Sequence, residues 1–149
     1  MPLVRISLRK GRTAEFRRKL GDALHRALVE TIDVPELDRF QLLTEHEPGD
    51  LIYDPGYLGI ARTNDIVIIQ ITISAGRGLQ QKRALFRRIA DNLAALGQRE
   101  EDVWINLVEV AKENWSFGLG EASYATPEVA KMPAPHPRSA HVQGRPPQG

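Results

Sequence analysis

The order strand, helix, strand occurs twice in this chain of 149 residues. Apolar residues that alternate or cluster in short β-branched runs predict strands, and apolar residues spaced three and four apart predict helices. The expected strands cover residues 3–8, 39–44, 65–74 and 102–110, and the expected helical stripes cover residues 16–31 and 86–96. Thr13 can cap the first helix, and Pro35 should end it because a proline disfavours helical geometry in the residue before it.

Two units of this kind predict an α+β fold with two βαβ units, in which a four-stranded mixed sheet carries both helices on one face. Residues 66–73 are apolar on both faces of their strand, so we expect a cover over the open face. Self-association is the simplest cover. Residues 45–64 form a polar excursion with two Pro-Gly turns, between which we expect a short hairpin.

The two halves can also be aligned on each other as an internal repeat. Residues 37–43 match residues 101–107 at an offset of 64, which pairs Asp38 with Asp102. The helical stripes match at an offset of 66, which pairs Leu20 with Phe86. We therefore expect the two halves to be similar structures with a small shift between helix and strand.

Composition excludes several classes of function. There are no cysteines, which rules out disulfides, iron–sulfur clusters, thiolate zinc sites and a cysteine nucleophile. Residues 1–124 hold 17 Lys and Arg against 18 Asp and Glu, so their charge gives no drive toward nucleic acid. No apolar run reaches the roughly 20 residues that span a bilayer, and residues 1–5 lack the apolar core of a signal peptide. We expect a cytoplasmic protein without membrane or nucleic-acid partners.

Residues 125–149 differ from the rest of the chain, and we expect two parts: a folded domain over residues 1–124 and a tail over residues 125–149. The tail holds six of the ten prolines and few large apolar residues. Such a segment buries too little apolar surface to offset its ordering entropy, so we expect it to be mobile. Its His136 and His141 are interpreted as solvated, and we expect no metal site.

The common catalytic motifs are missing: there is no P-loop, no Gly-x-Gly-x-x-Gly, no Gly-x-Ser-x-Gly and no His-Glu-x-x-His. The unusual feature is Pro2. If Met1 is removed, Pro2 becomes a free secondary amine, which can act as a base, an acid or a nucleophile. Burial and neighbouring cations can tune the pKa of such an amine.

Pro2 stands directly before the first strand of the repeat, and further motifs accompany it. These are Pro2-Leu3, Gly11-Arg12-Thr13, Val34-Pro35 with Asp38-Arg39-Phe40-Gln41, Thr44-Glu45-His46, Gly59-Ile60-Ala61-Arg62, and Trp115-Ser116-Phe117-Gly118 with Gly120. Together they resemble the tautomerase superfamily, and most closely its malonate semialdehyde decarboxylase group. The resemblance covers about residues 2–124.

The resemblance implies a role for each matching residue. Pro2 would be the acid–base group, and Asp38 would orient a water or hold Pro2 protonated. Arg77 would bind the substrate carboxylate or carbonyl, and its place before a helix N-terminus independently favours anions. Trp115 and Phe117 would wall an apolar pocket, to which Tyr124 can add. The resemblance also implies a homotrimer and a cofactor-free enzyme acting on a small carboxylate with a carbonyl or enol.

The sequence departs from the decarboxylase pattern at one turn. The decarboxylases carry two arginines there, whereas this chain has Ala75 and a single Arg77. Losing one cation weakens carboxylate binding and stabilisation of a developing enolate; Arg39 or Arg62 are candidates to compensate. Tautomerisation, decarboxylation and hydration all stay open. So do a non-enzymatic βαβ interaction module and a tautomerase fold with only promiscuous activity.

Overall fold

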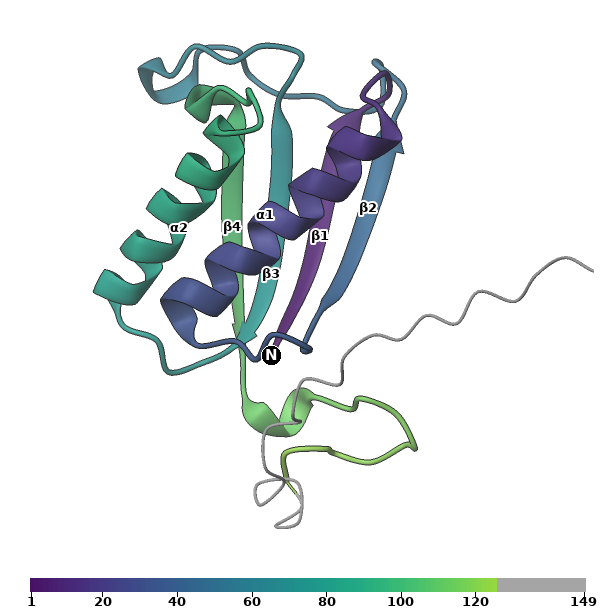
Figure 1. Cartoon of the computed structure of the whole chain (residues 1–149), viewed down its shortest axis with the longest axis vertical. Helices are drawn as coiled ribbons and strands as arrows, with labels where there is room; N and C mark the ends of the chain where they lie inside the picture. The colour runs from purple at the N-terminus through teal and green to yellow at the C-terminus, as the bar shows by residue number, and fades with distance from the viewer. Residues whose placement is uncertain (126–149) are drawn as a thin grey trace, which may run out of the picture.

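A computed structural model of the protein describes residues 1–125, and the expectations for the tail, His136 and His141 lie outside these residues. The elements are β1 (Pro2–Arg9), α1 (Ala14–Ile32), β2 (Phe40–His46), β3 (Val67–Ser74), α2 (Leu79–Ala94) and β4 (Val103–Val110). The sheet has the order β2-β1-β3-β4. β1 pairs with β2 and β3 pairs with β4 in parallel, while β1 and β3 are antiparallel. Both helices cover one face (Figure 1), which confirms the predicted fold.

The core lies between the helices and this face of the sheet. Its side chains alternate along the strands and recur every three or four residues along the helices, as the two periodicities require. The largest buried ones are Ile6, Leu8, Leu20, Leu24, Leu28, Ile69, Ile71, Ile73, Leu85, Ile89 and Leu93. Leu20 and Leu85 occupy equivalent buried positions, so the helical offset is 65 and the predicted 66 was wrong. Phe86 is 37% exposed instead of facing the core.

The end of α1 also differs from the prediction. Thr13 caps the helix as expected, accepting a hydrogen bond from the Phe16 amide at 3.0 Å. At the other end the helix stops at Ile32, before Pro35 can act, because Asp33 takes the left-handed conformation with φ 57°. The 33–39 loop therefore begins with a sharp change of direction that leads the chain toward the start of β1.

No helix of residues 1–125 covers the second face of the sheet (Figure 1). On β3 this face presents Ile68, Gln70 and Thr72, so the strand is apolar on both faces only in part. The edge strands add the exposed Phe40 and Leu42 of β2 and Trp104 of β4. This face is thus a mixed polar and apolar surface, on which the apolar side chains are interrupted by Gln70 and Thr72.

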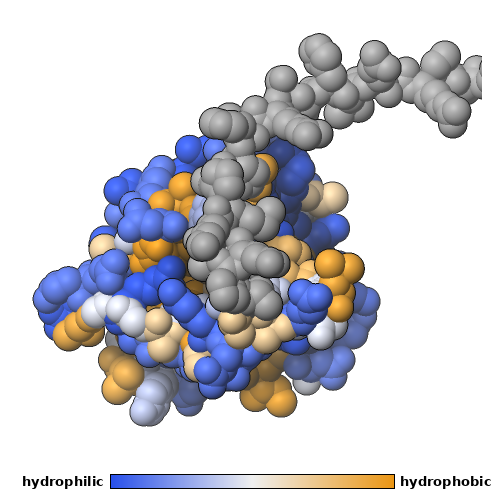
Figure 2. All heavy atoms as spheres, turned by 90° about the horizontal axis from the view of Figure 1, so that it is seen from below, coloured by the Kyte–Doolittle hydropathy of each residue, from blue (hydrophilic) through white to orange (hydrophobic). Residues whose placement is uncertain are grey.

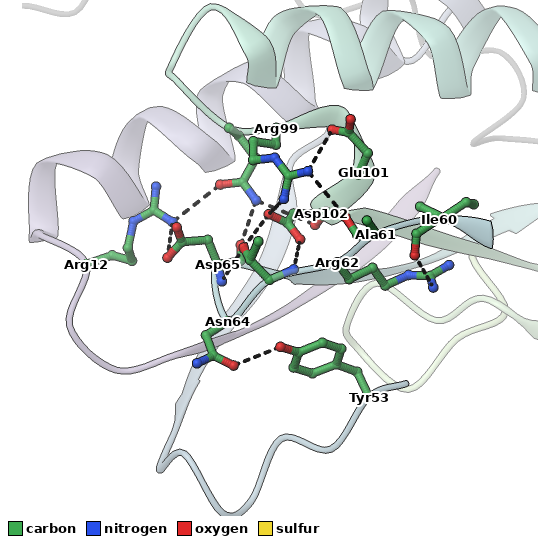
Figure 3. A network of polar contacts seen from close by, with 12 residues as sticks. Arg12, Tyr53, Ile60, Ala61, Arg62, Asn64, Asp65, Arg99, Glu101 and Asp102 are labelled. Carbon is green, nitrogen blue, oxygen red and sulfur yellow. Dashed lines mark hydrogen bonds and ion pairs between the residues drawn. The ribbon is translucent and has the colours of Figure 1, made fainter. Parts of the chain in front are cut away.

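The expected hairpin between the two Pro-Gly turns is absent. Within residues 47–66 the structure has one 3₁₀ turn, Tyr57–Gly59, and no strand. The segment is held instead by Asp102, whose carboxylate accepts hydrogen bonds from the amide and the hydroxyl of Thr63, each at 2.6 Å. Figure 3 shows this network, in which Arg99 also contacts Asp102.

The strand directions bring four chain segments to the end of the sheet that holds the N-terminus (Figure 1). These are the start of β1, the 33–39 loop before β2, the 75–78 turn after β3, and residues 111–125 after β4. The Asp102 network lies at the opposite end. Within residues 1–125, no helix is long and apolar enough to cross a membrane.

Candidate active site

The N-terminal end of the sheet brings together the residues that the sequence singled out. Pro2 is buried at the first position of β1, where it pairs with Ile73 of β3. Asp38 lies in the loop before β2, Arg77 in the turn before α2, and Trp115 beyond β4. Seen from this end, apolar side chains gather in several patches among polar ones (Figure 2).

The terminal amine and Asp38 form an ion pair. In the structure this amine belongs to Met1, and its nitrogen lies 3.6 Å from Asp38 Oδ2. The Asp38 side chain is only 9% exposed, and its buried Oδ2 accepts no hydrogen bond from the described residues. Burial raises the pKa of Asp38, while the amine and His25 oppose the increase. Removal of Met1 would transfer the amine to Pro2, one residue further into the sheet.

Burial also lowers the pKa of the amine. Asp38 opposes this effect, whereas the charges of Arg77 and Lys112 add to it. An amine with a lowered pKa is more often unprotonated near neutral pH, which is what a general base requires. The environment at this end therefore favours the unprotonated form of the terminal amine.

The Arg77 guanidinium is oriented by backbone carbonyls. It donates hydrogen bonds to the Ser74 carbonyl at 3.0 Å and to the Ile32 carbonyl at 3.2 Å. Two N–H groups thereby fix the planar fork, and the remaining donors stay available because a guanidinium carries five. Arg77 thus links the end of α1 to the turn before α2 and presents its charge near the amine.

An aromatic cluster borders the same place. Trp115 donates its indole N–H to Ser74 Oγ at 3.0 Å and stacks on Phe117 with ring centroids 5.6 Å apart. Phe117 also contacts Phe40 at 5.9 Å and meets Tyr124 edge-on at 5.4 Å. The cluster connects β2 with residues 115–124, which have no regular secondary structure beyond a short turn.

Tyr124 places a polar group in this cluster. Its hydroxyl is buried without a hydrogen-bond partner among the described residues. Burial and the charge of Asp38 raise the pKa of Tyr124 to about 12, and Arg77 opposes the increase. The phenol is therefore neutral at physiological pH and can donate a hydrogen bond to an oxygen that enters the site.

Sequence reasoning found the central residues and missed several neighbours. Lys112 and His25 carried no signal, because each joins the site only through the folding of a different element. Phe40 was noted only as part of the motif Asp38-Arg39-Phe40-Gln41. The two arginines considered as compensating cations lie elsewhere. Arg39 pairs with Asp22 at 2.8 Å, and Arg62 bonds backbone carbonyls near Tyr57 at the opposite end of the sheet. Lys112 is the second cation whose charge reaches the amine.

The arrangement can therefore bind an anion at Arg77, exclude water along the aromatic wall and move a proton at the amine. In the part of the chain that the structure describes, no group of three or more His, Cys, Asp or Glu residues could hold a metal ion.

Two family models described as tautomerase enzyme match this chain, over residues 38–118 and 2–59. The probable tautomerase YusQ of Bacillus subtilis (strain 168) is 42% identical over 123 residues, covering 82% of this chain and 97% of that protein. The probable tautomerase YrdN of the same organism is 37% identical over 127 residues, covering 85% and 98%.

Solved structures agree with these relatives. An FG41 malonate semialdehyde decarboxylase inhibited by 3-bromopropiolate is 44% identical with a TM-score of 0.81, covering 88% of this chain and 99% of that one. A second malonate semialdehyde decarboxylase, described with decarboxylase and hydratase activities, is 32% identical with a TM-score of 0.78, covering 83% and 95%. A fused 4-OT described as a symmetric trimer is 26% identical with a TM-score of 0.68, covering 83% and 98%. By sequence and by structure, the chain belongs to the tautomerase family.

Proposed function

We propose that the protein is a cofactor-free acid–base enzyme that uses the amine of Pro2, exposed by removal of Met1, on a small carboxylate bearing a carbonyl or enol. The observation that carries this proposal is the pairing of the terminal amine with a buried Asp38 at 3.6 Å, beside Arg77. The names of the tautomerase and decarboxylase relatives support the reaction class.

In a tautomerisation, Arg77 binds the substrate carboxylate and the unprotonated Pro2 nitrogen accepts the proton of the enol hydroxyl. The electron pair of that O–H bond forms the carbonyl, and the protonated Pro2 returns a proton to the adjacent carbon. In this cycle Asp38 stabilises the protonated amine, and the net change is an isomerisation with no group gained or lost.

In a decarboxylation the C–COO⁻ bond breaks instead. Its electron pair moves toward the neighbouring carbonyl, carbon dioxide leaves, and protonated Pro2 delivers a proton to the resulting enolate. A carbonyl polarised by cations or by the Tyr124 hydroxyl favours this step because negative charge develops on its oxygen. The same residues thus suit both reactions, which differ in the protonation state of Pro2 at the start.

We further propose that the protein forms a homotrimer in which other copies cover the open face of the sheet. That face carries Phe40, Leu42 and Trp104, which are 51%, 47% and 45% exposed. The fused 4-OT neighbour is described as a trimer. Sedimentation equilibrium of the full chain measures the mass directly, and a monomer would contradict this assembly.

The function is tested with Pro2→Ala, after intact mass has established whether Met1 is removed. Ketonisation of phenylenolpyruvate and decarboxylation of malonate semialdehyde are followed for both proteins. Alanine also exposes a free amine after Met1 removal but offers a primary one, so we expect turnover to fall by roughly 10²-fold or more. Full activity of Pro2→Ala, or a wild-type protein that retains Met1 and is still active, would exclude the proline mechanism.

Inactivity of the wild-type protein on both substrates would favour the interaction-module alternative. Weak ketonisation alone would favour a fold with promiscuous activity.

A further inference from the structure

A hollow of about 400 Å³ opens beside Arg77, between the end of α1, the turn after β3 and the start of α2. Lys112 of the 3₁₀ turn Lys112–Asn114 closes it from the segment after β4. Ala75 and Gly76 also line the hollow, and their small side chains leave it open. Its volume suits a small-molecule ligand.

Two of the side chains that line this hollow are cations without a carboxylate partner among residues 1–125. Arg77 donates only to backbone carbonyls, and Lys112 forms no ion pair with a described residue. By contrast, Lys82 on the neighbouring helix α2 pairs with Glu109 at 2.7 Å. Asp33 also lines the hollow, yet its carboxylate lies more than 4.0 Å from both cations, since it forms no ion pair with either.

The start of α2 adds to the positive character of this hollow. Gly78 occupies the N-cap position without a side chain that could satisfy the first amides of the 16-residue helix. Among residues 1–125, only the Gly78 amide at this helix start has a side-chain partner, Gln81 Oε1 at 3.1 Å, and the side-chain nitrogen of Gln81 has none. Helix N-termini attract anions through such amides.

We infer that this hollow is the carboxylate subsite of the proposed enzyme and that Lys112 is its second cation, binding the substrate carboxylate together with Arg77. The inference rests on the proposed function for the identity of the ligand, a small oxo-carboxylate. Lys112 supplies from the segment after β4 the charge that the turn itself lacks at Ala75. The hollow adjoins the start of β1, because Ser74, which lines it, directly follows Ile73, the β3 partner of Pro2.

The test compares Lys112→Gln, which removes the charge, with Lys112→Arg, which keeps it. Lys19→Gln is the matched control, because Lys19 pairs with Glu15 on the exposed face of α1, away from the hollow. Pyruvate serves as the probe in the millimolar range, and binding is followed through the backbone amide resonances of Gly76, Gly78 and Gln81. This readout needs no turnover, so it is independent of the proline mechanism.

We expect pyruvate to shift these resonances in the wild-type protein and its dissociation constant to rise about fivefold in Lys112→Gln. Lys112→Arg and Lys19→Gln should bind like the wild type. On a turned-over substrate, Lys112→Gln should raise KM by a similar factor and leave kcat within about twofold, because the contact is made equally in the ground state.

Wild-type affinity in Lys112→Gln, or pyruvate-dependent shifts that map away from these amides, would overturn the inference. Loss of the proposed function has a different signature. If Pro2→Ala kept full turnover, the acid–base assignment would fail while the pyruvate titration still reported on Lys112.

Discussion

The two ends of the sheet carry similar residues, but the hydrogen bonding of these residues differs. After β1 the chain runs through Gly11 at φ 119° to Arg12, and after β3 it runs through Gly76 at φ 125° to Arg77. In the same way Asp38 precedes β2, and the aligned Asp102 precedes β4. The repeat thus places one arginine and one aspartate at each end of the sheet. Arg77 and Asp38 lie at the end where β1 starts, and Arg12 and Asp102 lie at the end where β3 starts.

The two aspartates differ in how far their carboxylates are hydrogen-bonded. Asp102 is fully buried and accepts hydrogen bonds from Thr63, while Arg12 contacts Gln98 and Asp65 (Figure 3). Asp38 Oδ2 accepts no hydrogen bond from the described residues. Asp38, the aspartate with the buried unsatisfied oxygen, lies at the same end of the sheet as the terminal amine. A satisfied network stabilises a fold, whereas unpaired groups at a terminus remain available to a substrate.

The largest effect is expected from Asp38→Asn. The amide cannot stabilise a protonated amine, so turnover should fall by about 10²- to 10³-fold. Stability should stay equal or increase, because burial raises the pKa of Asp38 and the charged carboxylate is therefore disfavoured in the folded state. Steady-state kinetics and thermal unfolding on the same sample measure both quantities.

The sign of this stability change depends on pH. A raised carboxyl pKa means that the cost is present above the folded-state pKa and disappears as pH falls toward 3.8, the ordinary value. The advantage of Asp38→Asn should thus shrink on acidification. An Asp38→Asn protein that is less stable at neutral pH would show that the carboxylate stabilises the fold.

Asp102→Asn should have the opposite effects: it should lower stability and leave turnover almost unchanged. The new amide nitrogen would face the Thr63 donors in a site without solvent access, leaving buried groups unsatisfied. We expect a loss of about 3 kcal/mol in the free energy of unfolding. Urea unfolding measures it, while kcat per folded molecule should stay within about twofold. A catalytic defect in the folded Asp102→Asn protein would contradict the division of roles between the two ends.

The fold was predictable because its two periodicities are strong and repeat. The predictions about the fold that were wrong concern the choice between adjacent residues and the structure of one loop. Leu85 and Phe86 are adjacent apolar residues, so the stripe alone could not decide which of them faces the core. The loop over residues 47–66 is fixed by Thr63 and Asp102, a contact between distant segments that turn chemistry near the two Pro-Gly pairs does not encode.

The candidate site was predictable where it coincides with strand ends and motifs, as for Pro2, Asp38 and Arg77. Lys112 could not be placed, because the segment after β4 has no periodicity and takes its position from aromatic contacts such as Trp115 with Phe117. Sequence reasoning also cannot show that Asp38 lacks hydrogen bonds while Asp102 has them. That difference arises from the loops that each aspartate meets.

The pH dependence of turnover should also distinguish Asp38→Asn from Asp102→Asn, with a smaller effect than the change in turnover itself. Burial lowers the pKa of the Met1 amine below its ordinary value of 8.0, and Asp38 opposes this decrease. We expect the same two influences on the Pro2 amine after removal of Met1. Removing the Asp38 charge should therefore lower the pKa of the limb of kcat/KM that the amine controls, by about half a pH unit or more. This is the acidic limb where Pro2 must be unprotonated, as in tautomerisation, and the basic limb where it must be protonated, as in decarboxylation. In Asp102→Asn the same limb should not move. An upward shift in Asp38→Asn would mean that another group controls the amine.

The smallest effects on stability and binding are expected at the two helix N-caps. Thr13 and Gly78 can be compared because they begin the equivalent helices of the two halves. Thr13 caps α1 with its hydroxyl, whereas Gly78 gives α2 no hydroxyl. Thr13→Ala should cost about 1 kcal/mol. Gly78→Ser should gain a few tenths of a kcal/mol, since φ is −77° and a Cβ there meets no atom within 4 Å. Chemical denaturation measures both changes.

The serine hydroxyl would also occupy amides that we assign to the substrate carboxylate, so Gly78→Ser should raise KM about twofold while Thr13→Ala leaves it unchanged. A stabilised Gly78→Ser protein with an unaltered KM would show that the carboxylate binds without help from α2.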